Sequence, residues 1–280
     1  MFKVKPNTNI RKGIAFAGCS FTWGQGLYYY SNLPTLNEPA PDAYDESLLT
    51  QAQFNFKDSV RGARLVANNF NTFEIVQKNN GGSNDSIMGY FYELFQDEKP
   101  MSDRNCYGYN EVKYLVYQLT YWTRDKKQVI EDGHNFTFSW QDLLKDGSVE
   151  SINFFKYIRD KNYTFDELSA RYIQHSLMKV KKFLMHFESK GIKTIIYSWP
   201  VDFVQYIKQD EWLNKRFMEI NYNNQKYDCM ETMMKENRNL IINGDTVFFE
   251  DPPKDHHPSL ECHQVMAKNI IEKLNQYERQ

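Results

Sequence analysis

A serine follows an apolar run near the amino terminus of the 280-residue chain. Residues 13–17 are small or apolar, and Gly18, Cys19 and Ser20 come directly after them. The run predicts a β-strand, which would place the Ser20 hydroxyl at its carboxyl end, where open α/β sheets bind their ligands. A serine hydroxyl is an effective nucleophile only when a base and an oxyanion-stabilising site surround it. The rest of the sequence offers candidates for both.

The candidate base lies near the other end of the chain, where residues 255–259 are Asp-His-His-Pro-Ser. His257 could take the proton of Ser20 and return it to a leaving alcohol. Asp255 could hold the imidazole in the required tautomer and stabilise the imidazolium, and Asp251 is a second candidate for this role. We therefore predict a catalytic set of Ser20, His257 and Asp255.

The candidate oxyanion site lies in residues 80–85, Asn-Gly-Gly-Ser-Asn-Asp, after a second predicted strand. Gly82 has no side chain to obstruct an oxygen that approaches its backbone amide. That amide and the amide of Ser20 could together form an oxyanion hole, and Asn84 could add a side-chain donor. Trp23, next to the nucleophile, and Arg124, after a third predicted strand, are candidates for substrate contact, although packing and surface roles explain them equally well.

A metal site is the chemical alternative. His256, His257, His263 and Asp255 could supply ligands, but no helical i, i+4 spacing links the first two histidines. The four cysteines are scattered without a CxxC pair or zinc spacing, which predicts reduced thiols rather than disulfides. We expect neither a metal nor another cofactor.

The elements that must position these residues alternate along the chain. A capping box at residues 164–167, followed by apolar residues at helical spacing, predicts a long helix that ends near Gly191. Further helices are predicted at 59–70, at 85–95 and from about 260, and strands at 14–17, 73–76, 114–119, 194–197 and 240–242. This order predicts an α/β fold with a mostly parallel, five-stranded sheet covered on both faces. The segments 28–58, 97–111, 125–160 and 201–238 fit the alternation poorly, so we expect a single domain over residues 1–280 with four insertions.

The three polar blocks together resemble the SGNH (GDSL-type) hydrolases, and in particular the branch whose first block is Gly-Cys-Ser-Phe-Thr-x-Gly. The resemblance implies a flavodoxin-like, three-layer α/β/α sandwich that hydrolyses esters, acetylated sugars among them, without a metal. Two departures stand out. Thr120 lies where the family carries the Asn of Gly-x-Asn-Asp, which makes Thr120 a candidate for substrate contact. Many members place the Asp three residues before the His, where this chain has Lys254.

Composition narrows the classes of partner. A formal net charge of −2 gives no reason to expect nucleic acid as a partner, and no segment predicts a signal peptide or a transmembrane helix. We therefore expect a cytoplasmic or particle-associated protein that acts on a small-molecule or saccharide ester, with its oligomeric state open. The alternative is a weak or inactive SGNH-like binding or structural module of a virus particle, a hypothesis motivated by Thr120, the missing signal peptide and the Asn-, Lys-, Tyr- and Phe-rich composition.

Overall fold

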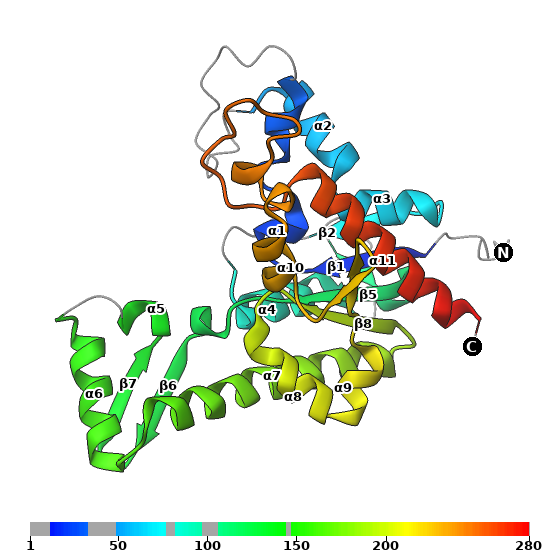
Figure 1. Ribbon diagram of the computed structural model, residues 1–280. Helices are drawn as coiled ribbons and strands as arrows, with labels where there is room; N and C mark the ends of the chain where they lie inside the picture. Colours follow the sequence, from blue (N-terminus) through cyan, green and yellow to red (C-terminus); the bar gives the residue numbers. More distant parts are fainter. Residues whose placement is uncertain (1–11, 33–48, 77–81, 97–105, 144–146, 280) are drawn as a thin grey trace, which may run out of the picture.

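The computed structural model describes residues 12–32, 49–76, 82–96, 106–143 and 147–279 (Figure 1). Its centre is a sheet of four parallel strands in the order β2-β1-β5-β8. The strands are β1 (Gly13–Ala17), β2 (Glu74–Val76), β5 (Val112–Leu119) and β8 (Lys193–Ser198). Four of the five predicted strands are therefore present, and all of them run in the same direction.

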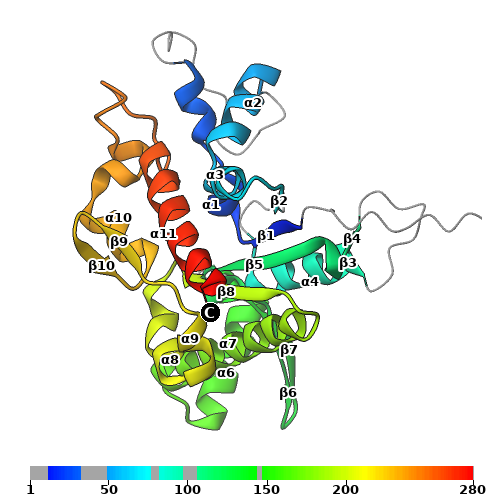
Figure 2. The same ribbon diagram turned by 90° about the vertical axis from the view of Figure 1, so that its right-hand side faces the viewer.

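Both faces of the sheet are buried, because successive residues of a strand point to opposite sides. One face contributes Ala15, Ala17, Leu115, Tyr117, Leu119 and Ile196 to an apolar cluster with α4 (Asn84–Leu94) and α7 (Phe165–Ser189). The other face contributes Ile14, Phe16, Tyr114, Val116, Ile195 and Tyr197 to a cluster with α3 (Gly62–Asn69), α10 (Met230–Glu236) and α11 (Leu260–Glu278). Figure 2 shows α3 and α11 on one side of the strands and α4 and α7 on the other. A mixed α/β fold with a parallel sheet flanked by helices is thus confirmed.

The long helix α7 begins and ends as its sequence predicts. The Thr164 hydroxyl accepts the backbone N–H of Glu167, and the Glu167 carboxylate accepts the backbone N–H of Thr164 at 3.0 Å, which satisfies two amides at the helix start. Gly191, just past the end, has a φ of +82°, a conformation that favours glycine. β8 follows directly.

The predicted fifth strand at 240–242 is not seen in the described part of the chain. Arg238–Leu240 and Ile242–Gly244 are 3-10 helices, and Ile241 makes only an isolated antiparallel bridge with Pro258. Burial in these turns explains the apolar run as well as a strand would. At the outer edge of β8, Ile196 instead forms a single parallel bridge with Phe217, and its carbonyl accepts the N–H of Met218 at 2.8 Å. Within the described residues, the sheet therefore has four strands rather than five.

The helix predicted at 59–70 corresponds to α3, whereas residues 59 and 60 end a separate helix, α2 (Gln51–Val60), that was not predicted. Arg61 between them is extended, with φ −63° and ψ 146°. Its guanidinium lies 2.6 Å from Asp58 and 2.8 Å from Glu74 of β2, so the break lets one arginine join the helix to the sheet.

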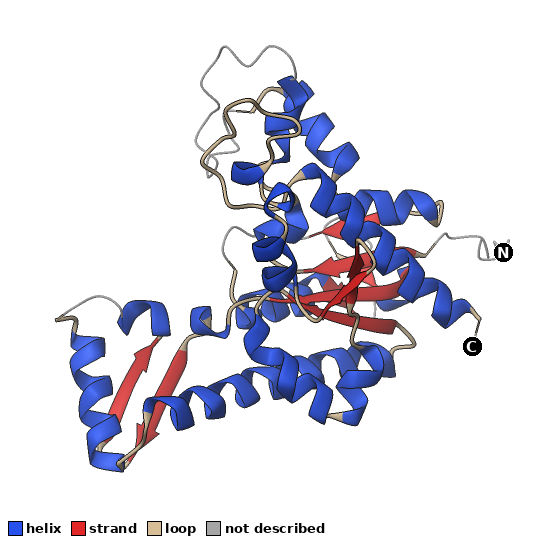
Figure 3. Cartoon of the chain, in the orientation of Figure 1, coloured by secondary structure: helices blue, strands red, loops and turns tan. Residues whose placement is uncertain are grey.

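The segments predicted as insertions contain short elements outside the sheet. The most prominent is the antiparallel hairpin of β6 (Lys127–Glu131) and β7 (His134–Phe138), which stands to one side with α5 (Trp140–Leu143) and α6 (Val149–Lys161) (Figure 3). The same segments also contain α2, α10, η1 (Leu27–Asn32), β4 (Tyr107–Gly108), η3 (Tyr109–Glu111), η5 (Val201–Phe203), α8 (Val204–Gln209), α9 (Glu211–Arg216), β9 (Ile220–Tyr222) and β10 (Gln225–Tyr227), and β3 (Phe95–Gln96) lies just before the second segment. Residues 33–48, 97–105 and 144–146 of the predicted insertions lie outside the described residues. The single-domain organisation stays a prediction. Within the described residues, no helix has the length and apolar character needed to cross a membrane.

Candidate active site

Ser20 opens a tight turn at the carboxyl end of β1. It is the first residue of the one-turn helix α1 (Ser20–Trp23), and only 5% of its surface is exposed. Gly18 lies so close to the following turn that a Cβ there would be 2.0 Å from the Thr22 hydroxyl oxygen and 2.8 Å from Gln118 Oε1. A glycine at this position is therefore required by packing, and it lets the chain turn sharply into α1.

Gln118, near the end of β5, organises this turn and was missed by the sequence analysis. Its Oε1 accepts the Thr22 hydroxyl at 2.7 Å, the backbone N–H of Cys19 at 3.4 Å and the Cys19 thiol at 3.6 Å. Gln118 is 1% exposed. Its signal in the sequence was an uncharged polar residue inside the otherwise apolar run of residues 114–119. Burial raises the pKa of the Cys19 thiol, so Cys19 remains a neutral packing residue at neutral pH.

Ser20, His257 and Asp255 form one chain of hydrogen bonds. His257 Nδ1 lies 2.6 Å from Asp255 Oδ1, and His257 Nε2 lies 3.1 Å from the Ser20 hydroxyl oxygen. Because a carboxylate only accepts, Nδ1 carries the proton and Nε2 is left to accept the serine O–H. The structure thus brings the three predicted catalytic residues together in hydrogen-bonding order.

Asp255 is held by hydrogen bonds from the backbone of two other residues, and it lies close against a glycine. Its Oδ1 also accepts the backbone N–H of His257 at 2.9 Å, and its carbonyl accepts the N–H of Asn243 at 2.9 Å. A Cβ on Gly26, whose φ is +86°, would be 2.7 Å from Asp255 Oδ2. Asp255 is 4% exposed, whereas Asp251 is exposed, so of these two carboxylates Asp255 is the one that contacts the imidazole.

The ring of Phe21 lies beside the imidazole of His257, and Trp199 stacks against Phe21. The Phe21 ring is 5.2 Å from the imidazole and stacks at 3.7 Å on Trp199. Trp23 instead packs against α2, with the Lys57 ammonium 4.0 Å from the centre of its ring and the Phe54 ring at 6.3 Å. Trp23 is 8% exposed, so its contact with a substrate stays a prediction.

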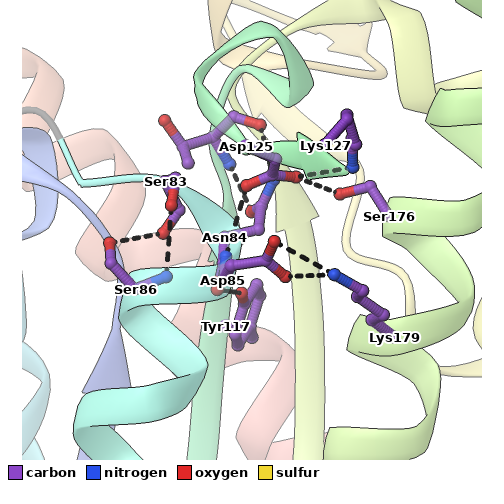
Figure 4. Close-up of polar contacts among 10 residues, drawn as sticks. Ser83, Asn84, Asp85, Ser86, Tyr117, Asp125, Lys127, Ser176 and Lys179 are labelled. Atoms are coloured by element: carbon purple, nitrogen blue, oxygen red, sulfur yellow. Dashed lines mark hydrogen bonds and ion pairs between the residues drawn. The ribbon is translucent and has the colours of Figure 1, made fainter. Parts of the chain in front are cut away.

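Among the remaining predicted residues, Thr120 contacts both Asn84 and Arg124 (Figure 4 shows Asn84). The Asn84 side chain donates to the Thr120 carbonyl and accepts the Thr120 N–H, both at 3.1 Å. The Thr120 hydroxyl accepts from Arg124 at 3.3 Å. Gly82 is buried and lies just before the residue that caps α4, whereas the neighbouring Gly81 lies outside the described residues. One N–H of the Asn84 amide is therefore used to hold the end of β5.

Of the four residues of the metal alternative, Asp255 and His257 contact each other, whereas His256 and His263 have other partners. Among the described residues, no group of three or more His, Cys, Asp and Glu side chains is arranged to hold a metal ion. His263 is buried, and its Nδ1 accepts the N–H of Gly62 at 3.1 Å. His256 is exposed and lies 3.0 Å from the Asn243 side-chain amide.

Comparison with known proteins gives a likeness to carbohydrate esterases at low identity. No protein-family model and no curated protein matches the chain. One similar solved structure is described as a carbohydrate esterase whose active site displays divergent catalytic and non-catalytic binding functions; it is 16% identical, with a TM-score of 0.43. Another is an acetyl xylan esterase from the rumen bacterium Butyrivibrio proteoclasticus, 11% identical, with a TM-score of 0.41. The chain is covered to 95% in both comparisons but spans only 65% and 64% of those two chains.

Proposed function

We propose that this chain is a serine hydrolase of the SGNH type, which cleaves a carboxylic ester through an acyl-enzyme. The observation that carries the proposal is the hydrogen-bonded chain from the Ser20 hydroxyl through His257 to Asp255. The sheet order β2-β1-β5-β8, with helices on both faces, supports a flavodoxin-like, three-layer α/β/α sandwich as its framework. In this proposal the segments outside the sheet are insertions into one domain.

The proposed reaction begins as the Ser20 oxygen attacks the ester carbonyl carbon. His257 Nε2 takes the hydroxyl proton during the attack and then gives it to the oxygen of the leaving alcohol, which departs as the carbon–oxygen bond breaks. Water then attacks the acyl-enzyme with the same proton transfers, which releases the acid and restores Ser20. Asp255 keeps the proton on Nδ1 and stabilises the imidazolium.

The negative charge that develops on the carbonyl oxygen needs donors in fixed positions. We assign this role to the backbone amides of Ser20 and Gly82, with the Asn84 side chain as a further donor. Removing one such donor costs about 3–4 kcal/mol of transition-state stabilisation in comparable enzymes.

We infer a small acyl group, an O-acetyl group on a saccharide, as the substrate. Ser20 is 5% exposed, which favours a small acyl group over a bulky one. The Phe21 ring beside His257 offers an apolar surface on which a sugar ring could pack.

The test is the Ser20→Ala variant assayed on nitrophenyl acetate, together with labelling of the wild-type protein by a fluorophosphonate. We expect covalent labelling at Ser20 and a loss of activity of at least about a thousandfold in Ser20→Ala. Full activity in Ser20→Ala would contradict the proposed mechanism. Chelation should leave the activity unchanged, because no metal takes part in the proposed steps.

A second candidate function is that of an SGNH-like binding or structural module, of a virus particle for example, without efficient catalysis. Thr120 favours it, because it replaces the Asn side chain that the family aims at the oxyanion, and the nearby Asn84 amide already holds the Thr120 backbone. This candidate predicts no fluorophosphonate labelling of Ser20, whereas the hydrolase predicts labelling that is lost in His257→Ala.

A further inference from the structure

The first turn of α4 is held by a hydrogen bond to a buried carboxylate that takes no part in the proposed catalytic steps. Asp125 is 0% exposed and follows the short 3-10 helix η4 (Trp122–Arg124) after β5. Its Oδ1 accepts the backbone N–H of Asp85 at 3.2 Å, and its Oδ2 accepts the hydroxyl of Ser176 on α7 (Figure 4). The ammonium of Lys127 lies 3.9 Å from the same carboxylate.

The chemistry of a helix start explains why a carboxylate belongs there. The first amides of a helix have no partner within the helix, and their dipoles make that end positive. Ser83 satisfies one of them by accepting the N–H of Ser86 at 3.1 Å, and Asp125 satisfies another from a separate segment. Burial raises the pKa of Asp125, while the hydrogen bond from Ser176 and the charge of Lys127 lower it. The hydrogen bond from Ser176 and the nearby charge of Lys127 offset part of the cost of burying the carboxylate.

Two further contacts hold the same turn. The Asn84 side chain forms its paired hydrogen bonds with the backbone of Thr120 at the end of β5. The carboxylate of Asp85 accepts two hydrogen bonds from Lys179 of α7, both at 3.0 Å. The start of α4 is therefore joined to the sheet, to the segment after it and to α7.

We propose that Asp125 is a positioning residue for the oxyanion site. This inference rests on the proposed function, in which the Gly82 amide is a donor to the oxyanion. Only two residues separate Gly82 from Asp85, and both are themselves hydrogen-bonded: Ser83 caps the helix and Asn84 pairs with Thr120. The Asp125 carboxylate fixes the Asp85 amide and, through this short rigid stretch, the direction of the Gly82 N–H.

The proposal implies a specific kinetic effect. A donor aimed at a developing charge stabilises the transition state more than the bound ester, so its displacement lowers kcat rather than raising KM. Acylation and deacylation use the same donors, so both steps slow together. A misplacement of about 1 Å is enough for an effect near a hundredfold.

The experiment compares three variants on nitrophenyl acetate. Asp125→Ala should lower kcat about 10- to 100-fold and change KM by less than about twofold. Asp125→Asn, whose amide oxygen can still accept the Asp85 N–H, should recover most of that loss. Asp210→Ala is the matched control, because Asp210 also caps a helix, accepting the N–H of Leu213 at 3.0 Å, and pairs with Lys181 of α7 at 2.6 Å. It should leave kcat unchanged.

Amide hydrogen exchange tests the same inference without relying on activity. In Asp125→Ala, peptides that cover residues 82–94 should exchange faster than in the wild type, and in Asp210→Ala they should not. If the peptides that cover residues 82–94 exchange at the wild-type rate in Asp125→Ala, the proposal is wrong, whatever the activity of that variant. Faster exchange with unchanged kcat, in a protein that Ser20→Ala inactivates, would overturn the positioning role and leave the proposed function standing. Full activity in Ser20→Ala would instead overturn the proposed function and, with it, the oxyanion role of the turn.

Discussion

The Ser20 hydroxyl and the His257 imidazole are 3.1 Å apart although 237 positions separate them in the sequence. β1 presents the serine at its carboxyl end, and the segment before α11 returns to the same edge of the sheet with the histidine. This convergence of Ser20 and His257 is the strongest support for the proposed hydrolase.

Asp255, the carboxylate that contacts the His257 imidazole, should be needed for full activity. Asp255→Asn replaces an acceptor with an amide that can donate to Nδ1, which favours the wrong tautomer, so kcat should fall by about 10³- to 10⁴-fold. Asp251→Asn, at the exposed neighbouring carboxylate, should retain wild-type activity in the same nitrophenyl acetate assay. A larger loss in Asp251→Asn than in Asp255→Asn would reverse the assignment.

Gly26 should be intolerant of a side chain. A methyl group there would lie 2.6 Å from Ile242 and 2.7 Å from Asp255 Oδ2, at a φ of +86°. We expect Gly26→Ala to lower both the thermal midpoint and kcat, because it displaces the carboxylate. Gly191→Ala separates the two causes, since Gly191 has a φ of +82° with nothing within 4 Å of the added carbon. It should cost about 1–2 kcal/mol from backbone strain and leave kcat unchanged.

Gln118 should matter through the groups that it satisfies. Gln118→Leu leaves the buried Thr22 hydroxyl without its 2.7 Å acceptor, and we expect a loss of about 1–3 kcal/mol in the free energy of unfolding measured in urea. Adding Thr22→Val removes the orphaned hydroxyl as well. The double variant should therefore be less destabilised than the two single variants predict by addition, and strict additivity would contradict the proposed link.

The stability of the fold should depend on pH through His263. Burial, and to a smaller extent the nearby His257 and Arg61, lowers the pKa of His263 to about 3, from 6.5 in an exposed chain. Above pH 6.5 neither state binds the proton, so the group has no effect. Below it the unfolded chain binds a proton that the folded chain rejects until about pH 3, and the free energy of unfolding falls by up to about 1.4 kcal/mol per pH unit.

The measurement is urea unfolding between pH 7 and pH 4. His263→Gln offers an oxygen to the Gly62 N–H but does not titrate, so its stability should fall less steeply with acid than that of the wild type. His256→Gln, at an exposed histidine, controls for the loss of an imidazole in general. Equal slopes in wild type and His263→Gln would mean that other groups govern the acid response.

Much of the framework could be predicted because its signals are local. The capping box at Thr164 and the apolar spacing after it define α7, and short apolar runs define four strands. The strand prediction at 240–242 was wrong because a run of three apolar residues fits a buried turn as well as it fits a strand. The break at Arg61 was not predicted, and the ion pair of Arg61 with Glu74 of β2 forms only in the folded chain.

The candidate site divides in the same way. Ser20, Asp255 and His257 could be named because short motifs carry them. Gln118 and Asp125 could not, because each acts on partners far away in sequence: Thr22 is 96 positions from Gln118, and Asp85 is 40 from Asp125. Such partnerships depend on the order of strands in the sheet, which a single sequence does not fix.

The bridge between Ile196 and Phe217 at the outer edge of β8 affects whether the sheets of two copies of this protein can pair. An open strand edge can template pairing with another chain, and the usual defences are short strands, charged residues and local cover. Here Phe217 and Met218 occupy the middle of the outer edge of β8, Lys193 begins the strand with an exposed charge, and β2 at the other edge has only three residues. We therefore expect the protein to resist edge-to-edge aggregation at high concentration, although no fifth strand pairs with β8 in the described part of the chain.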